Sequence, residues 1–500
     1  MVNEEGKLYV AHGTCPLTLE PKMANRHGLI AGATGTGKTV SLQVLAESFS
    51  DLGVPCFMAD MKGDLSGVSK AGKLTNFIAK RETEFGVKFN FQPYPVQFFD
   101  VYGAQGTPLR VSVKEFGVML FSRIMDLTDT QEGVLNAVFR ICEDKNIKLD
   151  DLKDLRAALN FVGQNAKEFQ TDYGNLSSAS IGAIQRNLLA LESQGGDQFF
   201  GLPVFDVEDF MVTENMNGVK KGMINILAAD KLYNNPRLYS AFLMWLLTSI
   251  YNKMPEVGDL DKPKFIFFFD EAHLLFDDAS KVLMEQIEKI VRLIRSKGVG
   301  VYFITQSPTD IPEDVLGQLG NKIQHALRAF TPKDKKAIKA VAESFRANES
   351  IDTETVLLEL ETGEALISFL DEKGAPRVVE RAKMLCPQGQ IGPITEEERQ
   401  TIIKSCCLEQ KYGEVMDRAS AYEYFKNLEE KKKAEEERLR LEKEEEEREE
   451  REEREREKER KTSKKKSSKS ETNSFWNKVI IPIAKSFGNQ LVRNLMKKMK

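Results

Sequence analysis

A phosphate-binding loop near the N-terminus is the first part of the sequence that could carry chemistry. Residues 32–39 match GxxxxGK[ST], between an apolar run and a segment with helical periodicity. Glycines let successive N–H groups turn around phosphate oxygens, and the dipole of a following helix favours the same anion. We therefore expect ATP and Mg²⁺ to bind through nine consecutive residues, Gly32, Ala33, Thr34, Gly35, Thr36, Gly37, Lys38, Thr39 and Val40.

Two residues of this loop have defined tasks in such a motif. Lys38 is expected to reach the β- and γ-phosphates, which makes it catalytic as well as nucleotide-binding. Thr39 is expected to hold Mg²⁺ through its hydroxyl. Kinases, GTPases and motors share this loop, so it does not decide the reaction.

An acidic pair follows a strongly apolar run later in the chain. Asp270 and Glu271 come directly after Phe-Ile-Phe-Phe-Phe at 265–269. Asp270 is expected to hold the Mg²⁺ shell and Glu271 to orient and deprotonate the attacking water, since phosphoryl transfer depends on positioning and charge neutralisation. The alternative is structural, because Asp at a helix N-cap and Glu in the first turn are both favourable.

Two further polar residues could assist hydrolysis. Gln306 follows the apolar run 300–305 and would face the γ-phosphate if that strand lies beside the strand before the phosphate loop. A solvated loop residue is the alternative for Gln306. His273, two residues after Glu271, could couple hydrolysis to a substrate or could simply lie on a helix surface.

A catalytic arginine is also expected, because hydrolysis in motors of this kind usually needs a cation from a neighbouring subunit. Arg292 and Arg295 lie three apart on a predicted helix, and Arg328 follows a later strand. Arg295 is the preferred candidate. At least one of the first two could instead pair with Glu285 or Glu288.

Strands and helices alternate around these motifs. Helical periodicity appears at about 235–253 and 279–297, and buried strands are predicted by the apolar runs at 28–31, 55–59, 223–228, 265–269 and 299–305. Such alternation predicts a mostly parallel sheet covered on both faces. A short strand or a hairpin is expected at 7–19, and a closing hairpin from 364–370 and 376–382. The expected fold is α/β, a RecA-like P-loop NTPase of the additional-strand, catalytic-glutamate type.

Periodicity and composition divide the chain into six segments. A nearly continuous helical pattern predicts an insertion that splits the core, and a run of charged residues with Glu four before Arg predicts an isolated helix of about 50 Å. No sustained apolar seam favours a coiled coil there. The segments are the first part of the core at 1–111, the insertion at 112–198, the second part of the core at 199–390, a helical extension at 391–428, the charged helix with a flexible Ser/Lys link (462–474) at 429–474, and a tail at 475–500.

Charge is distributed unevenly along the chain. Residues 429–500 carry 23 Lys+Arg against 18 Asp+Glu, whereas the preceding residues carry 48 against 58. An acidic body argues against a broad basic face for nucleic acid, although a ring needs only a basic lining in its pore. The tail at 475–500 is basic and amphipathic, and it could attach to a membrane surface, dock on the body or on a partner subunit, or be disordered.

Other features of the sequence favour a reducing, cytoplasmic setting, with peripheral membrane attachment only through the tail. Six scattered cysteines without CxxC spacing and only four histidines indicate neither a disulfide framework nor a structural metal site. The N-terminal residues are charged where a signal peptide needs an apolar run. No uncharged apolar run reaches eighteen residues, so no membrane span is expected.

With these motifs the chain resembles the HerA–FtsK superfamily of hexameric translocating ATPases, and most closely the bacterial HerA-like proteins. The resemblance covers most of residues 7–390. It implies a RecA-like core, a homohexameric ring, active sites between subunits and DNA translocation. The matching segments are 25–28 leading into 32–39, 59–67, 270–273, 295–300, 305–308 and 324–332.

Two functions remain open from the sequence. The first is a ring ATPase that translocates or remodels DNA, with or without helicase activity. The second is an ATP-driven switch or scaffold that acts on protein partners or at a membrane surface, which the acidic body and basic tail would suit. A small-molecule kinase is disfavoured, because a water-orienting Glu271 would waste ATP in such an enzyme.

Overall fold

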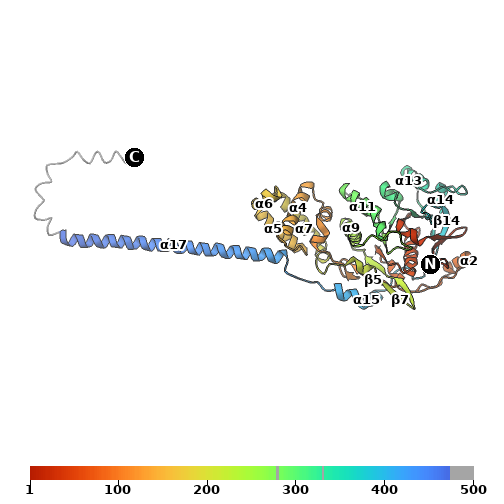
Figure 1. The fold of residues 1–500 in the computed structure, drawn as a ribbon, viewed down its shortest axis with the longest axis horizontal. Helices are drawn as coiled ribbons and strands as arrows, with labels where there is room; N and C mark the ends of the chain where they lie inside the picture. Colours follow the sequence, from red (N-terminus) through yellow and green to blue (C-terminus); the bar gives the residue numbers. More distant parts are fainter. Residues whose placement is uncertain (278–280, 329–330, 473–500) are drawn as a thin grey trace. The chain divides into compact units, whose positions relative to one another are not determined.

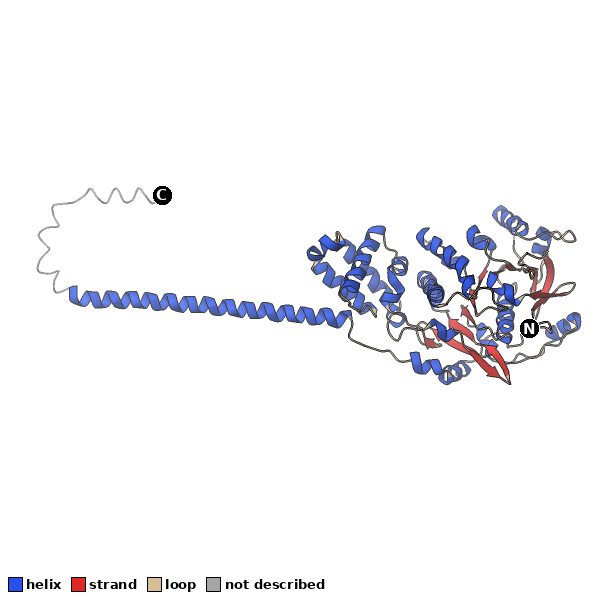
Figure 2. Cartoon of the chain, viewed as in Figure 1, coloured by secondary structure: helices blue, strands red, loops and turns tan. Residues whose placement is uncertain are grey.

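The computed structural model describes residues 1–277, 281–328 and 331–472 (Figure 1). The chain forms two compact units, residues 1–424 and residues 425–500. Every strand of the described residues belongs to the first unit, where helices surround the strands (Figure 2). This first unit therefore contains the sheet that positions the phosphate loop and the acidic pair.

A 12-stranded sheet is the centre of the first unit, in the order β2-β1-β14-β13-β12-β3-β11-β10-β4-β9-β5-β6. The strands from β12 to β6 in this order run parallel, and the four on the other side of β12 pair antiparallel. The bounds are β1 Leu8–His12, β2 Pro16–Leu19, β3 Gly28–Ala31, β4 Cys56–Asp60, β5 Val96–Asp100, β6 Thr107–Pro108, β9 Ile224–Ala228, β10 Phe265–Phe269, β11 Val299–Thr305, β12 Asn321–Gln324, β13 Glu364–Ser368 and β14 Glu380–Met384.

The predicted mostly parallel sheet is confirmed, and so are both hairpins. The N-terminal hairpin β1–β2 and the closing hairpin β13–β14 join the same sheet, since Ala11 pairs with Met384. β11 lies between β3 and β10, with Thr305 opposite Ala31 and Phe303 opposite Phe269. This inserted strand confirms the additional-strand type of fold.

Burial explains why the central strands are so apolar. All five side chains of β10 are completely buried, which requires cover on both faces of the sheet. Phe268 meets Phe49 of helix α1 (Lys38–Asp51), and Phe267 stacks on Phe57 of β4 at 4.8 Å between ring centroids. The other helices of the core are α2 Asn76–Phe85, α9 Pro236–Lys253, α10 His273–Phe276, α11 Lys281–Ile294, α12 Glu313–Leu316, α13 Pro332–Glu343 and α14 Thr353–Glu359.

The predicted helical insertion is present. Its helices begin at defined caps, as at Thr128 and Asp151, whose side chains accept from the third residue of α4 and α5. A cluster of phenylalanines, including Phe116, Phe121 and Phe200, packs α3 against the chain that returns to the sheet. The helices are α3 Val113–Ile124, α4 Asp129–Asp144, α5 Leu152–Gln164, α6 Ala166–Tyr173, α7 Ser178–Ser193 and α8 Gly196–Phe199.

Several strands escape sequence analysis. β12 reads Asn-Lys-Ile-Gln, and its polar Asn321 is buried because the side-chain amide donates to the carbonyls of Met23 and His27. A buried polar side chain with hydrogen-bond partners thus stands where an apolar one would be expected. β5, β6 and a separate hairpin of β7 (Thr213–Met216) with β8 (Val219–Gly222) were not expected either.

The C-terminal part differs from the sequence expectation in one respect. The extension contains α15 Glu396–Ser405 and α16 Cys407–Tyr412, but the charged helix α17 runs from Ala421 to Thr472. It therefore starts earlier than expected, passes through the Ser/Lys stretch predicted to be flexible and is about 78 Å long at 1.5 Å per residue. Lysine and serine do not interrupt a helix as glycine or proline would, which explains the wrong prediction.

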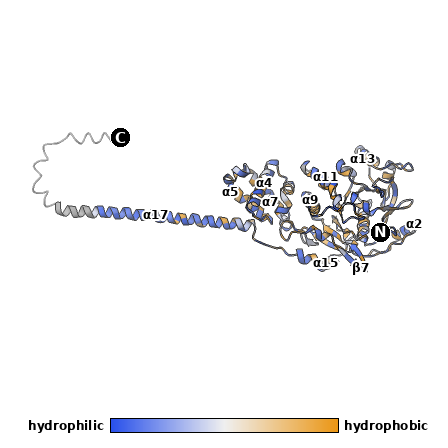
Figure 3. Cartoon of the chain, in the orientation of Figure 1, coloured by the Kyte–Doolittle hydropathy of each residue, from blue (hydrophilic) through white to orange (hydrophobic). Residues whose placement is uncertain are grey.

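Hydrophilic residues make up most of the coloured length of helix α17 (Figure 3). Every residue from 430 to 462 is exposed, and i,i+4 ion pairs such as Arg440 to Glu444 line it. The predicted basic tail at 475–500 lies outside the described residues. Within the described part of the chain, no helix combines the length and apolarity needed to cross a bilayer.

We predict that Gly28→Ala destabilises the first unit by about 1–3 kcal/mol through overpacking. A Cβ at Gly28 would lie 2.3 Å from the ring of Tyr302, which is buried and held by its hydroxyl to the Ala24 carbonyl. Urea unfolding followed by circular dichroism measures the change. Gly133→Ala is the matched control, because a Cβ there meets no atom within 4 Å, and equal midpoints for the two variants would contradict the prediction.

Candidate functional site

The phosphate loop connects β3 to α1, as expected. Gly32, Gly35 and Gly37 have φ values of 152°, 79° and 113°, which disfavour side chains. A Cβ on Gly32 would lie 2.5 Å from the Cβ of His325, so only glycine lets the loop pass so close to β12. Thr34 and Gly35 are exposed at the loop tip. This cradle fits a bound phosphate chain.

Lys38 begins α1, and its ammonium group turns back across the loop. Its Nζ donates to the carbonyls of Gly32 at 2.6 Å and Ala33 at 3.3 Å. Burial lowers the pKa of Lys38, and the carboxylates of Glu271 and Asp270 partly oppose that shift. The amine and both carboxylates therefore share one electrostatic environment, as the motifs predict.

The acidic pair lies directly after β10, at the edge of the sheet where the phosphate loop follows β3. Burial and the neighbouring Glu271 raise the pKa of Asp270 to about 7, although one Asp270 carboxylate oxygen accepts from the Glu271 amide at 2.9 Å. A carboxylate with this environment gains stability from a cation. Thr39, in the first turn of α1, is the other residue predicted to face that cation.

Glu271 has an unusual backbone and an unsatisfied side chain. Its φ of 47° lies in the left-handed region, which is costly for a glutamate. Its buried Oε2 accepts no hydrogen bond from any residue that the structure describes. It lies 3.4 Å from His273 Nδ1. Such a carboxylate oxygen can accept a proton from water, which is the role expected of Glu271.

Gln306 and His273 both lie near the loop and the acidic pair. Thr305, the last residue of β11, accepts through its carbonyl from the Gly32 amide at 3.3 Å, so the exposed Gln306 follows directly beside the phosphate loop. His273 begins α10 and is half-buried beside Glu271. The strand arrangement on which the Gln306 hypothesis depended is confirmed, whereas the role of Gln306 stays a prediction.

The arginine candidates occupy opposite edges of the sheet. Arg295 lies in a short 3-10 helix before β11, with its carbonyl 3.5 Å from the Asn25 amide, which precedes β3. This is the edge where parallel strands begin, away from the phosphate loop of the same chain. Arg328 follows β12 and is exposed on the loop's edge, and Arg292 is exposed on α11. Arg295 therefore lies away from the phosphate loop of its own chain, and its catalytic role stays a prediction.

His325 packs against Gly32 of the phosphate loop and bonds to the helix that follows it, a role that sequence analysis missed. Its ring nitrogens lie 2.8 Å from the Ser41 hydroxyl of α1 and 2.8 Å from the Glu364 carbonyl. Its amide donates to the Ala31 carbonyl at 2.7 Å. Burial lowers the pKa of His325 to about 4, so the ring is neutral at pH 7 and bridges α1 to β13.

Tyr239 and Asp60 support the acidic pair and its neighbourhood. The buried Tyr239 hydroxyl of α9 donates to the Asp270 carbonyl at 2.9 Å. Asp60, at the end of β4, accepts from the amides of Lys62, Asp64 and Leu65 and so shapes the turn that follows. The supporting roles of Tyr239 and Asp60 could not be identified from sequence, because each side chain bonds to main-chain atoms.

An apolar cavity of about 400 Å³ lies beside the phosphate loop. Gly37 and Val40 line it on one side, and Phe77, Ile78 and Arg81 of α2 line another. The Arg81 guanidinium lies 5.2 Å from the Phe77 ring centroid, and its buried Nη1 has no hydrogen-bond partner among the described residues. A flat, partly polar group would fit this cavity.

Comparisons with known proteins agree with this geometry. The family model described as helicase HerA-like C-terminal matches residues 6–500. The chain is 24% identical over 371 residues to the DNA double-strand break repair helicase HerA of Sulfolobus acidocaldarius, covering 72% of this chain and 66% of that protein. It is 25% identical over 350 residues to the protein of the same name from Sulfurisphaera tokodaii, covering 68% and 62%. The chain thus spans slightly less than two thirds of these relatives.

A solved structure has the same fold. The bacterial conjugative coupling protein TrwBdeltaN70 aligns with a TM-score of 0.51 and 16% identity, over 78% of this chain and 92% of that one. The sheet order with β11 between β3 and β10 confirms the RecA-like P-loop fold. With the family match over nearly the whole length, the chain belongs to the helicase HerA-like C-terminal family.

Proposed function

We propose that this protein is an ATP-hydrolysing motor of the HerA-like type, which forms a homohexameric ring and translocates or remodels DNA. One observation carries the proposal. Lys38, Asp270 and Glu271 share one sheet edge, and a buried oxygen of Glu271 has no hydrogen-bond partner among the described residues. Relatives named as DNA repair helicases and a TrwB structure in complex with ADP and Mg²⁺, at a TM-score of 0.50, support it.

The residues divide the chemistry of hydrolysis among them. Residues 32–37 would bind the phosphates through their amides, and Lys38 would leave the Gly32 carbonyl to meet the β- and γ-phosphates. Thr39 and Asp270 would hold Mg²⁺, which neutralises phosphate charge when bound. Glu271 would orient a water and accept its proton. Gln306, beside Gly32, would donate to the γ-phosphate.

The cavity beside Val40 is the proposed site for the base and ribose of ATP. It opens next to the first turn of α1, where the phosphate chain would end. Phe77 offers a ring for stacking, and the unpartnered Nη1 of Arg81 offers a donor. A nucleotide in this position would cover the apolar lining of the cavity and give Nη1 of Arg81 a hydrogen-bond partner.

We predict that Glu271→Gln lowers the ATPase rate by about 100-fold or more while ATP binding persists, because it removes only the base. Glu285→Gln is the matched control, since Glu285 is an exposed acid on α11.

Wild-type hydrolysis should rise with single- or double-stranded DNA at low salt and lose this stimulation as salt rises. Hydrolysis that needs Glu271 but ignores DNA would favour a protein partner or a membrane surface instead.

Phe77→Ala is expected to weaken ATP binding by about 2- to 10-fold, the usual worth of an aromatic contact, with little change in kcat. Leu74→Ala is the control, because Leu74 is as exposed, at 59% against 58%, but does not line the cavity. Titration with a fluorescent ATP analogue measures both. Equal affinities for Phe77→Ala and the wild type would place the base elsewhere.

A mixing experiment tests the subunit that supplies Arg295. Arg295→Ala and Glu271→Gln should each be inactive alone, and mixed rings should recover part of the ATPase rate, because some interfaces combine an intact Glu271 with an intact Arg295. Recovery requires subunit exchange, which mass spectrometry of the mixed rings verifies. Mixed rings without recovered activity would exclude Arg295 as the cation supplied in trans.

A further inference from the structure

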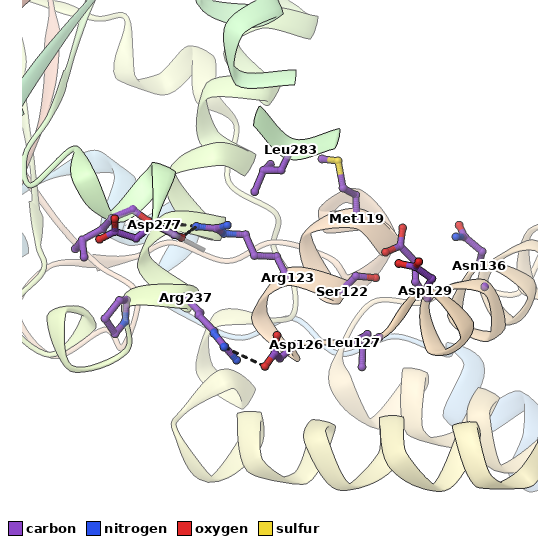
Figure 4. Close-up of a pocket in the computed structure, with 14 residues that line it drawn as sticks. Met119, Ser122, Arg123, Asp126, Leu127, Asp129, Asn136, Arg237, Asp277 and Leu283 are labelled. Carbon is purple, nitrogen blue, oxygen red and sulfur yellow. Dashed lines mark hydrogen bonds and ion pairs between the residues drawn. The ribbon is translucent and has the colours of Figure 1, made fainter. Parts of the chain in front are cut away.

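A second cavity lies between the helical insertion and the core, next to α10, the helix that follows the acidic pair. It has a volume of about 700 Å³ and is lined by residues of α3, α4, α9, α10 and α11 (Figure 4). Met119 and Leu283 face each other across it, and Asp126 and Arg237 lie at its rim. Beside the packing of α3 on α9, the insertion therefore meets this part of the core through polar contacts around an open space.

Arg123 makes the most extensive of these contacts. It lies in the last turn of α3 and reaches toward the segment that ends in Asp277 (Figure 4). Its Nη2 is 3.2 Å from the Leu274 carbonyl and 3.3 Å from the carbonyls of Leu275 and Asp277. Its Nε donates to the Ser240 hydroxyl of α9 at 3.0 Å. One guanidinium thus satisfies the carbonyls at the end of α10.

Helix α10 is tied directly to the acidic pair. It starts two residues after Glu271, and the Leu274 amide donates to the Glu271 carbonyl at 3.0 Å. The Ala272 amide donates to the Ile304 carbonyl of β11 at 2.9 Å, which fixes the near end of this segment. Arg123 fixes the far end. The left-handed backbone of Glu271 lies at the near end of this short segment, and such a strained conformation persists only where the surrounding contacts hold it.

The ion pair between Arg237 and Asp126 is a contact of a different kind. Arg237 Nη2 lies 3.0 Å from an Asp126 oxygen, with the two side chains 48% and 72% exposed. An exposed ion pair of this sort contributes little. It also joins the insertion to α9 without touching α10. The Asp126–Arg237 pair therefore only attaches the insertion to α9. Arg123, by contrast, contacts the segment after Glu271.

We propose that Arg123 is a positioning residue for hydrolysis, through which the helical insertion controls the placement of the Glu271 carboxylate. The inference rests on the proposed function, because Glu271 must be the base for its placement to matter. When the insertion shifts, the guanidinium pulls or releases the end of α10, and the carboxylate moves relative to the water and the γ-phosphate. Displacements of about 1 Å can change rates about 100-fold.

The test compares Arg123→Ala, Arg123→Lys and Asp126→Asn in the full-length protein. Arg123→Ala should lower kcat about 10- to 100-fold while the dissociation constant of a non-hydrolysable ATP analogue changes less than about twofold, since the phosphate loop is untouched. Arg123→Lys should have an intermediate kcat, because one ammonium cannot span the same carbonyls. Asp126→Asn should leave kcat unchanged, and asparagine suits the positive φ of 52° at this position.

Thermal unfolding and Glu271→Gln complete the experiment. An unchanged kcat in folded Arg123→Ala, or equal losses in Arg123→Ala and Asp126→Asn, would overturn the inference. If Arg123→Ala does not fold, Arg123→Lys decides: a kcat reduced about threefold or more supports the inference, and a wild-type kcat overturns it. Full activity of Glu271→Gln would instead overturn the proposed function, so the two failures are distinguishable.

Discussion

Parallel pairing of β3, β11 and β10 is the constraint on which the rest of the structure depends. Because parallel strands end at one edge, the phosphate loop after β3, Gln306 after β11 and Asp270 with Glu271 after β10 must lie together, although more than 200 residues separate the first from the last. The pairing is held by complete burial of β10 and β11. The apolar core and the chemistry of the site are thus consequences of the same hydrogen-bonded register.

This arrangement concentrates charge where water is scarce. Lys38 loses hydration, and the pKa of Asp270 rises to about 7 through burial and the adjacent Glu271. Neither charge is fully compensated by its neighbours, and the Glu271 oxygen lacks a hydrogen-bond donor among the described residues. The site is therefore electrostatically costly by itself, and a nucleotide with Mg²⁺ supplies the opposite charges that it needs. Tyr239 and His325 hold the backbone in place against that cost.

The sequence predicted the elements that follow simple patterns. The apolar runs at 28–31, 265–269 and 299–305 are strands with the expected bounds, and the glycine spacing at 32–37 located the loop. β12 was missed because two of its four residues are buried polar ones, Asn321 and Gln324, whose side-chain amides donate hydrogen bonds to carbonyls instead of packing as apolar groups. Arg123 was missed because its contacts to the segment after Glu271 are with carbonyl groups, which leave no trace in residue type. Long-range contacts to the main chain are thus the part of the site that spacing does not reveal.

A crystal structure of this protein with a non-hydrolysable ATP analogue and Mg²⁺ tests the central claim most directly. The account predicts the triphosphate within residues 32–39, Lys38 Nζ moved from the Gly32 carbonyl to the γ-phosphate, and Mg²⁺ between Thr39 and Asp270. It also predicts a water between the Glu271 carboxylate and the γ-phosphate, and the base against Phe77. A triphosphate bound away from Lys38, or a Glu271 carboxylate turned away from the γ-phosphate, would contradict it.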